Sequence, residues 1–178
     1  MEDQRVETLK HIEEVKKQID IVVVALQDRA AKHDASKLES PEREIFDKYT
    51  PKLKGTTYGS EEYKQCLAGM KTALDHHYAS NRHHPEHFVY HECNGCFERY
   101  YQEVNICNIC GYSQFTDRPD IAQMNLIDLV EMFCDWKAAT LRHTDGDIKK
   151  SIAINKKRFE ISDELTAILL NTVEILND

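Results

Sequence analysis

The stretch VETLKHIEEVKKQIDIVVVALQDRAAKHD, residues 6–34, decides the class of fold. Its apolar side chains follow the a and d offsets of an amphipathic helix and are Ile12, Val15, Ile19, Val22 and Leu26. Seven residues beyond Leu26 the same seam reaches His33, and Asp34 begins the following turn. The stretch predicts a long helix over residues 6–33, whose His33 faces the interior of a helical bundle.

Helical signals continue through most of the remaining chain. Ser40-Pro41 and Ser60 are N-cap signals for two further helices, and residues 50–59 between those helices are expected to form a loop. The expected helices span residues 41–49, 60–81, 124–143, 147–158 and 163–176. We therefore predict an all-α protein with a single domain over residues 1–178.

Length and charge narrow the class of protein. A chain of 178 residues corresponds to about one domain, and 31 acidic against 23 basic residues give a net charge of −8. That charge disfavours a broad surface for nucleic-acid backbones. No apolar run approaches the roughly 20 residues of a spanning helix, and the first residues, MEDQRVETLK, carry acids where a signal peptide carries positive charge. We expect no membrane partner and a cytoplasmic location.

Residues 89–118 lose the helical period and are expected to form an inserted hairpin. Two C-x-x-C pairs lie in it, Cys93 with Cys96 and Cys107 with Cys110. Pairs of this spacing enclose one tetrahedral zinc ion, which is structural when protein fills every position. Gly95 and Gly111 are expected at turns that need positive φ. Two disulfides or a redox motif are the alternatives, disfavoured because nothing signals export and neither pair opens a βαβ unit.

Metal-type ligands also recur on helix faces that should be apolar. The candidate ligands are His33, Asp34, His77, His83, His84, Asp128 and Asp135. Asp128 and Asp135 are seven residues apart and share one face of a helix. A carboxylate that points into a core is costly unless it is paired or binds a metal. Histidine with aspartate suits a divalent ion that keeps open positions, and Lys37 is placed to neutralise phosphate or carry a proton. A purely structural polar network is the alternative.

Short motifs add a resemblance to known families. The string His33-Asp34-Ala35-Ser36-Lys37 resembles the H-D signature of HD-domain metal-dependent phosphohydrolases, with His77 and His83-His84-Pro85-Glu86 similar to their later elements. The chain also looks like a family of small uncharacterised phage and bacterial proteins, which implies the cytoplasm of a bacterial host if the chain is phage-encoded. That likeness rests on H-D-x-S-K (residues 33–37), T-Y-G-S-x-E-Y (57–63), H-x-x-x-N-x-H-H-P-E-H-F (77–88) and L-V-E-M-x-C-D-W (129–136).

The resemblance implies an HD-like helical bundle into which the cysteine segment is inserted. It implies a hydrolase of nucleotides or small phosphoesters, in which a metal hydroxide attacks phosphorus and the helical site holds Mn²⁺, Mg²⁺, Fe or Zn²⁺. Asp34, Lys37, Asn81 and Arg82 would serve catalysis, with Lys37 and Arg82 stabilising phosphate charge and Asn81 orienting the substrate or an imidazole. The rival hypothesis is a non-enzymatic phage accessory or adaptor protein with a structural zinc knuckle. Whether the chain forms a homo-oligomer stays open.

Overall fold

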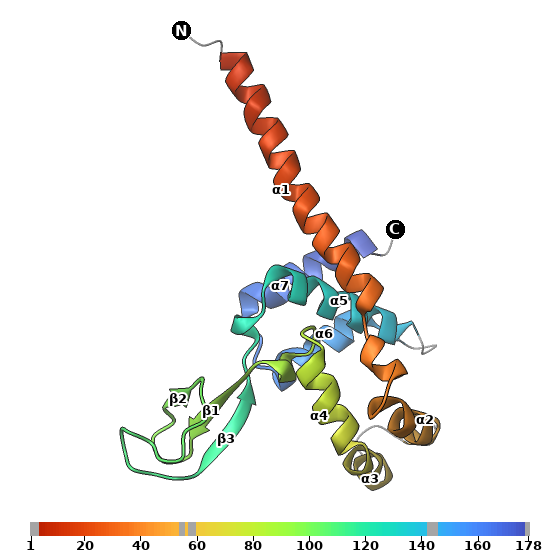
Figure 1. Cartoon of the computed structure of the whole chain (residues 1–178), viewed down its shortest axis with the longest axis vertical. Coiled ribbons are helices and arrows are strands. Elements are labelled where there is room, and N and C mark those ends of the chain that lie inside the picture. Colours follow the sequence, from red (N-terminus) through yellow and green to blue (C-terminus); the bar gives the residue numbers. More distant parts are fainter. Residues whose placement is uncertain (1–3, 54–55, 57–59, 142–145, 177–178) are drawn as a thin grey trace. The chain divides into compact units, whose positions relative to one another are not determined.

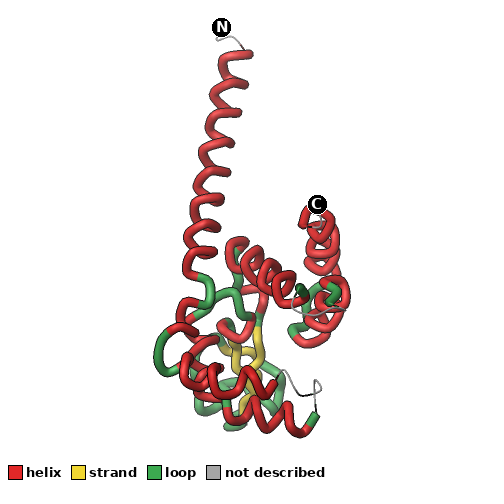
Figure 2. Tube along the Cα trace, turned by 90° about the vertical axis from the view of Figure 1, so that its right-hand side faces the viewer, coloured by secondary structure: helices red, strands yellow, loops and turns green. Residues whose placement is uncertain are grey.

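A computed structural model describes residues 4–53, 56, 60–141 and 146–176. It divides the chain into two compact units, Met1–His33 and Asp34–Asp178, where the sequence suggests one domain. The described part of the chain is mostly helical, with seven α-helices, short 3-10 turns and one small sheet. Figure 2 shows how the strands are confined to a single segment among the helices.

The first unit consists of helix α1 (Gln4–Lys32), which Figure 1 shows as one continuous helix. The long amphipathic helix is therefore confirmed. None of its described residues is buried, however, and Ile12 and Ile19 of the apolar seam are 56% and 57% exposed. Ion pairs one turn apart, such as Lys10 with Glu7, line its polar surface.

The second unit opens with a 3-10 turn and three helices. They are η1 (Ala35–Leu38), α2 (Glu42–Leu53), α3 (Glu61–Gly69) and α4 (Lys71–Ser80). Helix α2 packs against α3 and α4. It extends past the expected end at Tyr49 and contains Pro51, so the expected loop over residues 50–59 begins later. Residues 54–55 and 57–59 of that loop lie outside the described residues.

The single helix expected over residues 60–81 is divided at Met70. The backbone N–H of Met70 donates to the carbonyls of Cys66 and Leu67, at 3.1 and 3.0 Å, which tightens the last turn of α3 before α4 begins. A short 3-10 turn, η2 (Pro85–His87), follows α4 because proline prevents the preceding residue from continuing a helix. Helix α4 and this turn carry most of the histidine-rich segment.

The inserted segment forms a three-stranded antiparallel sheet. Strand β1 (Val89–Cys93) lies between β2 (Arg99–Tyr100) and β3 (Phe115–Pro119), as Figure 1 shows. The β1–β3 register pairs Cys93 with Phe115. The expected hairpin is thus present, and its strands bring two distant parts of the cysteine segment together.

The remaining helices enclose the apolar core. They are the 3-10 turn η3 (Ile121–Gln123), α5 (Leu126–Thr140), α6 (Ile148–Arg158), α7 (Asp163–Thr172) and the 3-10 turn η4 (Val173–Leu176). Phe133 of α5, Ile152 of α6 and Leu169 of α7 are buried in one cluster, and Met132 of α5 packs in another. Helix α5 therefore joins the two clusters. Within the described residues, no helix is both long and apolar enough to cross a membrane.

Candidate metal centres

A group of histidine and aspartate ligands forms where α4 ends. His77 lies in the last turn of α4, and His83 and His84 follow where the chain leaves the helix before Pro85. Asp34 joins them from the turn before η1, with a left-handed backbone of φ 55° and ψ 15°. Aspartate tolerates that conformation better than most residues. Each residue of this group, called here the histidine–aspartate group, offers one ligand atom within 4.8 Å of the others.

The spacing of these atoms fits a common ion. The Nε2 atoms of His77 and His84 are 2.9 Å apart, and Asp34 Oδ1 lies 3.3 Å from His77 Nε2. His83 Nε2 lies 3.5 Å from the same oxygen. Ligand atoms held about 2.0–2.2 Å from one ion are roughly 2.8–3.6 Å from each other, for angles between octahedral and tetrahedral. The group can therefore hold a divalent cation with its atoms close to where they already lie.

The surroundings of His84 favour its neutral imidazole. The side chains of His77 and His83 are 1% exposed, whereas that of Asp34 is 22% exposed, so the site is not sealed. Burial lowers the pKa of His84 to about 3, reinforced by the positive charges of His83 and His77, and the carboxylate of Asp135 only partly opposes this. A neutral imidazole keeps the lone pair that a metal needs.

Carboxylates that the sequence reasoning missed surround the histidines. Glu42 accepts hydrogen bonds from Nδ1 of His77 and from Nδ1 of His76, at 2.8 and 2.7 Å. Glu131 lies 3.2 Å from Nδ1 of His83. Glu131 belongs to the L-V-E-M-x-C-D-W segment and could have been chosen there. Glu42 follows Ser40-Pro41 and resembles an ordinary acid of a first helical turn, so no sequence signal distinguished it.

Two predicted catalytic residues lie beside the group. Lys37 Nζ is 2.7 Å from Asp34 Oδ2, the oxygen that does not face the histidines, and stands over the ring of Phe46. Asn81 Nδ2 donates to Ser36 Oγ and to the backbone carbonyl of His77, at 2.8 and 2.9 Å. Asn81 thus contacts the backbone of His77 and the Ser36 hydroxyl.

The remaining predicted ligands have different surroundings. Asp128 accepts a hydrogen bond from the Asn125 N–H at the start of α5, and its carboxylate binds Arg82 through two hydrogen bonds of 3.0 and 3.2 Å. The structure therefore leaves Asp128 outside the histidine–aspartate group and gives Arg82 a structural partner. Asp135 lies near enough for its charge to act on His84. His33 closes the first unit and precedes Asp34 in the chain.

A second group consists of the four cysteines of the insertion. All four are free thiols whose Sγ atoms lie within 4.8 Å of one another. Cys93 is 3.6 Å from Cys110 and Cys96 is 3.5 Å from Cys107, between sulfur atoms. Thiolates on one tetrahedral zinc are about 3.8 Å apart, for Zn–S bonds of about 2.3 Å. The group, called here the cysteine group, is therefore arranged to hold a metal rather than two disulfides.

Matching turns build the two halves of the cysteine group. The N–H of Phe97 donates to the carbonyl of Cys93, and that of Gly111 to the carbonyl of Cys107, at 2.8 and 2.9 Å. Phe97 and Gly111 both have positive φ, 62° and 74°. Positive φ was expected at Gly95, but in the first turn the residue with positive φ is Phe97. Gly95 is needed for space instead, since a Cβ there would lie 3.0 Å from Cβ of Tyr112.

A tyrosine outside the C-x-x-C pairs contacts the cysteine group. The Tyr100 hydroxyl lies 3.2 Å from Cys107 Sγ, and this hydrogen bond lowers the pKa of the Cys107 thiol to about 6. The backbone N–H of Cys110 also donates to that sulfur. Cys107 is therefore poised to bind a metal as the thiolate.

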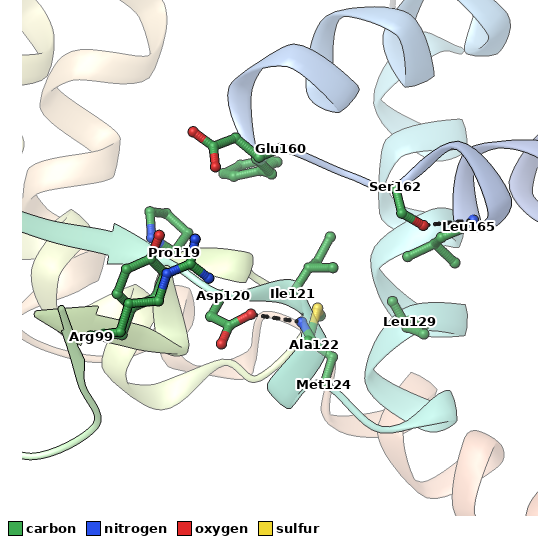
Figure 3. A pocket seen from close by; sticks show the side chains of 12 residues that line it. Arg99, Pro119, Asp120, Ile121, Ala122, Met124, Leu129, Glu160, Ser162 and Leu165 are labelled. Carbon is green, nitrogen blue, oxygen red and sulfur yellow. Dashed lines mark hydrogen bonds between the residues drawn. The ribbon is translucent and has the colours of Figure 1, made fainter. Parts of the chain in front are cut away.

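A separate pocket lies between the insertion and the C-terminal helices. The cavity has a volume of about 470 Å³. Figure 3 shows Arg99, Asp120 and Glu160 among the side chains that line it. The Arg99 guanidinium stands 4.5 Å over the Tyr90 ring, and Asp120 accepts a hydrogen bond from the Ala122 N–H. No member of the two ligand groups lines it, so the pocket is distinct from both candidate metal centres.

The fold is mostly helical, and its histidine–aspartate group and cysteine group could each hold a metal ion. The sequence profile of a family of unknown function, DUF5662, matches residues 1–175. The chain belongs to this family. No curated protein and no solved structure matches the chain.

Proposed function

We propose that the protein is a metal-dependent phosphohydrolase acting on a nucleotide or small phosphoester. The convergence of Asp34, His77, His83 and His84 within 4.8 Å carries the proposal. The four nitrogen and oxygen donors would leave two coordination positions for water and substrate on a six-coordinate Mn²⁺, Mg²⁺ or Fe ion, and would leave one on Zn²⁺ where it expands to five ligands. Such an ion supplies Lewis acidity and lowers the pKa of water.

The protein's own residues supply the remaining requirements. Oδ1 of Asp34 faces the histidines, and Oδ2 forms an ion pair with Lys37. The Asp34 carboxylate therefore holds the Lys37 ammonium at the edge of the site. The side chain of Lys37 is 34% exposed and can meet an incoming phosphate from solvent. Asn81 and Ser36 hold the end of α4 in place through the hydrogen bond between them. The resemblance of the H-D-x-S-K and later histidine motifs to HD-domain enzymes supports the same reaction class.

The cysteine group is proposed to hold a structural zinc ion. Four thiolates complete a tetrahedral shell and leave no position for substrate. This ion would fix the tip of the β1–β3 sheet without taking part in hydrolysis. Zinc content and phosphatase activity are therefore expected to be separable.

Metal content per chain tests the proposal. Wild type, supplied with Mn²⁺ and Zn²⁺ and then desalted, should carry zinc at the cysteine group and a second ion, and should hydrolyse members of a nucleotide and phosphoester panel. The Asp34→Ala, His77→Ala double variant should keep the first zinc and lose the second ion and the activity. His11→Ala, an exposed histidine of α1, is the matched control. One ion in both proteins and no hydrolysis would contradict the proposal.

An adaptor protein is the second candidate function. Apolar side chains around the cysteine group favour it, since Phe97 is 70%, Ile106 64% and Ile109 67% exposed. Exposed apolar residues in such a cluster are typical of protein-binding surfaces. This candidate requires the structural zinc alone, and the metal measurement therefore separates it from the enzyme.

A further inference from the structure

We infer that Glu42 is a positioning residue for the histidine–aspartate group, which fixes the His77 imidazole with Nε2 directed at Asp34 and His84. This inference rests on the proposed metal site and names a residue that the resemblance to HD-domain enzymes does not. Glu42 lies on α2, far in sequence from His77 on α4, and reaches it because these two helices pack together.

The hydrogen bond between the two side chains sets the proton position on the ring. His77 Nδ1 lies 2.8 Å from Glu42 Oε2, and the side chains are 1% and 0% exposed. A carboxylate only accepts, so Nδ1 carries the proton and Nε2 of the neutral ring keeps its lone pair. That Nε2 is the atom 2.9 Å from His84 Nε2 and 3.3 Å from Asp34 Oδ1.

The other neighbours of Nδ1 do not account for this orientation. Asn81 Nδ2 is 3.0 Å away but is a donor, and Ser36 Oγ is 3.3 Å away, beyond the length of a good hydrogen bond. Both already take part in the hydrogen bond between Asn81 and Ser36. A lone pair on Nδ1 would face a carboxylate, which is repulsive, so Glu42 decides the tautomer.

Both oxygens of the buried Glu42 side chain have a donor, and His77 Nδ1 lies on one of them. His76 Nδ1 satisfies the second oxygen at 2.7 Å, so the carboxylate is oriented from both sides.

The same arrangement recurs on a second ligand. His83 Nδ1 lies 3.2 Å from Glu131 Oε1, while His83 Nε2 faces Asp34 Oδ1. Carboxylates that accept from the distal nitrogen of a metal-binding histidine commonly fix its tautomer and raise its basicity. Two such pairs from two different helices, α2 and α5, make a chance polar contact a poor explanation.

The test compares Glu42→Gln with two matched controls in protein whose cysteine group is loaded with zinc. Glu44→Gln changes an exposed acid of the same helix, and His76→Ala removes the other imidazole from Glu42 but keeps the His77 pair. Mn²⁺ affinity is measured by electron paramagnetic resonance, and the His77 tautomer by long-range ¹H–¹⁵N spectra without Mn²⁺. Glu42→Gln should weaken Mn²⁺ binding about 10–100-fold and lower the Nδ1–H population. Glu44→Gln should stay within about twofold of wild type, and His76→Ala, which leaves Glu42 oriented from one side only, should fall between the two.

Unchanged Mn²⁺ affinity and an unchanged tautomer in Glu42→Gln would overturn the positioning role while leaving the metal site intact. If wild type binds no Mn²⁺, the proposed function fails, but the tautomer comparison still decides the role of Glu42. Should Glu42→Gln not fold, the wild-type spectrum decides alone. Nδ1–H on His77 supports the inference, and Nε2–H overturns it.

Discussion

The two ligand groups differ in how the chain builds them. The cysteine group comes from residues 93–110, one short segment whose turns place both C-x-x-C pairs. The histidine–aspartate group combines Asp34 with residues 77–84, which the contact between η1 and α4 brings together. Four thiolates fill the tetrahedral shell of zinc, whereas three imidazoles and one carboxylate leave two positions open on an octahedral ion. A group built from one short segment is suited to a structural metal ion, and a group assembled from distant elements is suited to a catalytic metal ion.

Their surroundings differ in the same sense. Backbone N–H groups and one tyrosine hydroxyl contact the sulfur atoms of the cysteine group. Acidic and basic side chains surround the histidines instead, namely Glu42, Glu131 and the Lys37–Asp34 pair. Backbone contacts hold a fixed geometry, whereas side-chain carboxylates adjust the basicity of a ligand. The following substitutions break or sharpen this contrast.

The largest effect is expected for Cys107→Ala. The variant should lose about one equivalent of zinc per chain, and with it the order of the sheet, because a structural zinc site contributes directly to folding. Elemental analysis and amide spectra of β1–β3 measure this. Cys134→Ala, an exposed free cysteine outside the group, should keep the zinc. An ordered sheet in zinc-free Cys107→Ala would show that the metal is dispensable.

His83→Ala should leave the β1–β3 sheet and its zinc intact and remove the ion of the histidine–aspartate group. His83 is buried, and its Nε2 faces Asp34, so its loss should weaken Mn²⁺ binding by roughly 100-fold or more, at least as much as losing a residue that merely supports a ligand. Zinc at the cysteine group should stay unchanged. Titration with Mn²⁺ is the measurement, and His91→Ala on β1 is the control. Loss of both metals together would mean that the two groups are not independent.

Arg82→Ala separates a structural role from a catalytic one. The bidentate pair with buried Asp128 predicts a loss of roughly 1–3 kcal/mol in the free energy of unfolding, moderated because Arg82 is half-exposed. Mn²⁺ affinity should not change. Denaturant unfolding and the kcat of any activity found are compared. A fall in kcat without a loss of stability would restore the role in phosphate binding expected from the sequence.

The smallest effects are expected at the turns of the cysteine group. Gly111→Ala should destabilise the sheet by about 1 kcal/mol through its positive φ alone, because no atom crowds its added Cβ. Phe97→Gly should stabilise the opposite turn by up to about 1 kcal/mol, since Phe97 is 70% exposed and has little packing to lose. Thermal unfolding of the zinc-loaded variants measures both. If Gly111→Ala and Phe97→Gly changed the unfolding temperature in the same direction, positive φ at these two positions would not explain their effects on stability.

Much of the candidate site was predictable because its signals are local. The C-x-x-C pairs and the run His83-His84-Pro85 identify ligands by residue type and spacing alone. Asp128 was predicted as a ligand because its spacing from Asp135 places both on one helix face. In the structure Asp128 accepts a hydrogen bond from the backbone at the start of α5 and pairs with Arg82. The pair with Arg82 spans 46 residues, and no periodicity of the sequence predicts it.

The sequence by itself determined the helices, the inserted hairpin and most of the metal-type ligands. Periodicity, caps and C-x-x-C spacing act over a few residues, and such short-range rules can be followed along the chain. Only the tertiary structure decided which ligands meet and which carboxylates support them. Glu42 reaches His77 across 35 residues, and that contact exists because α2 packs on α4. Because Glu42 and His77 are both buried, the hydrogen bond between them is stronger than the same bond would be in water.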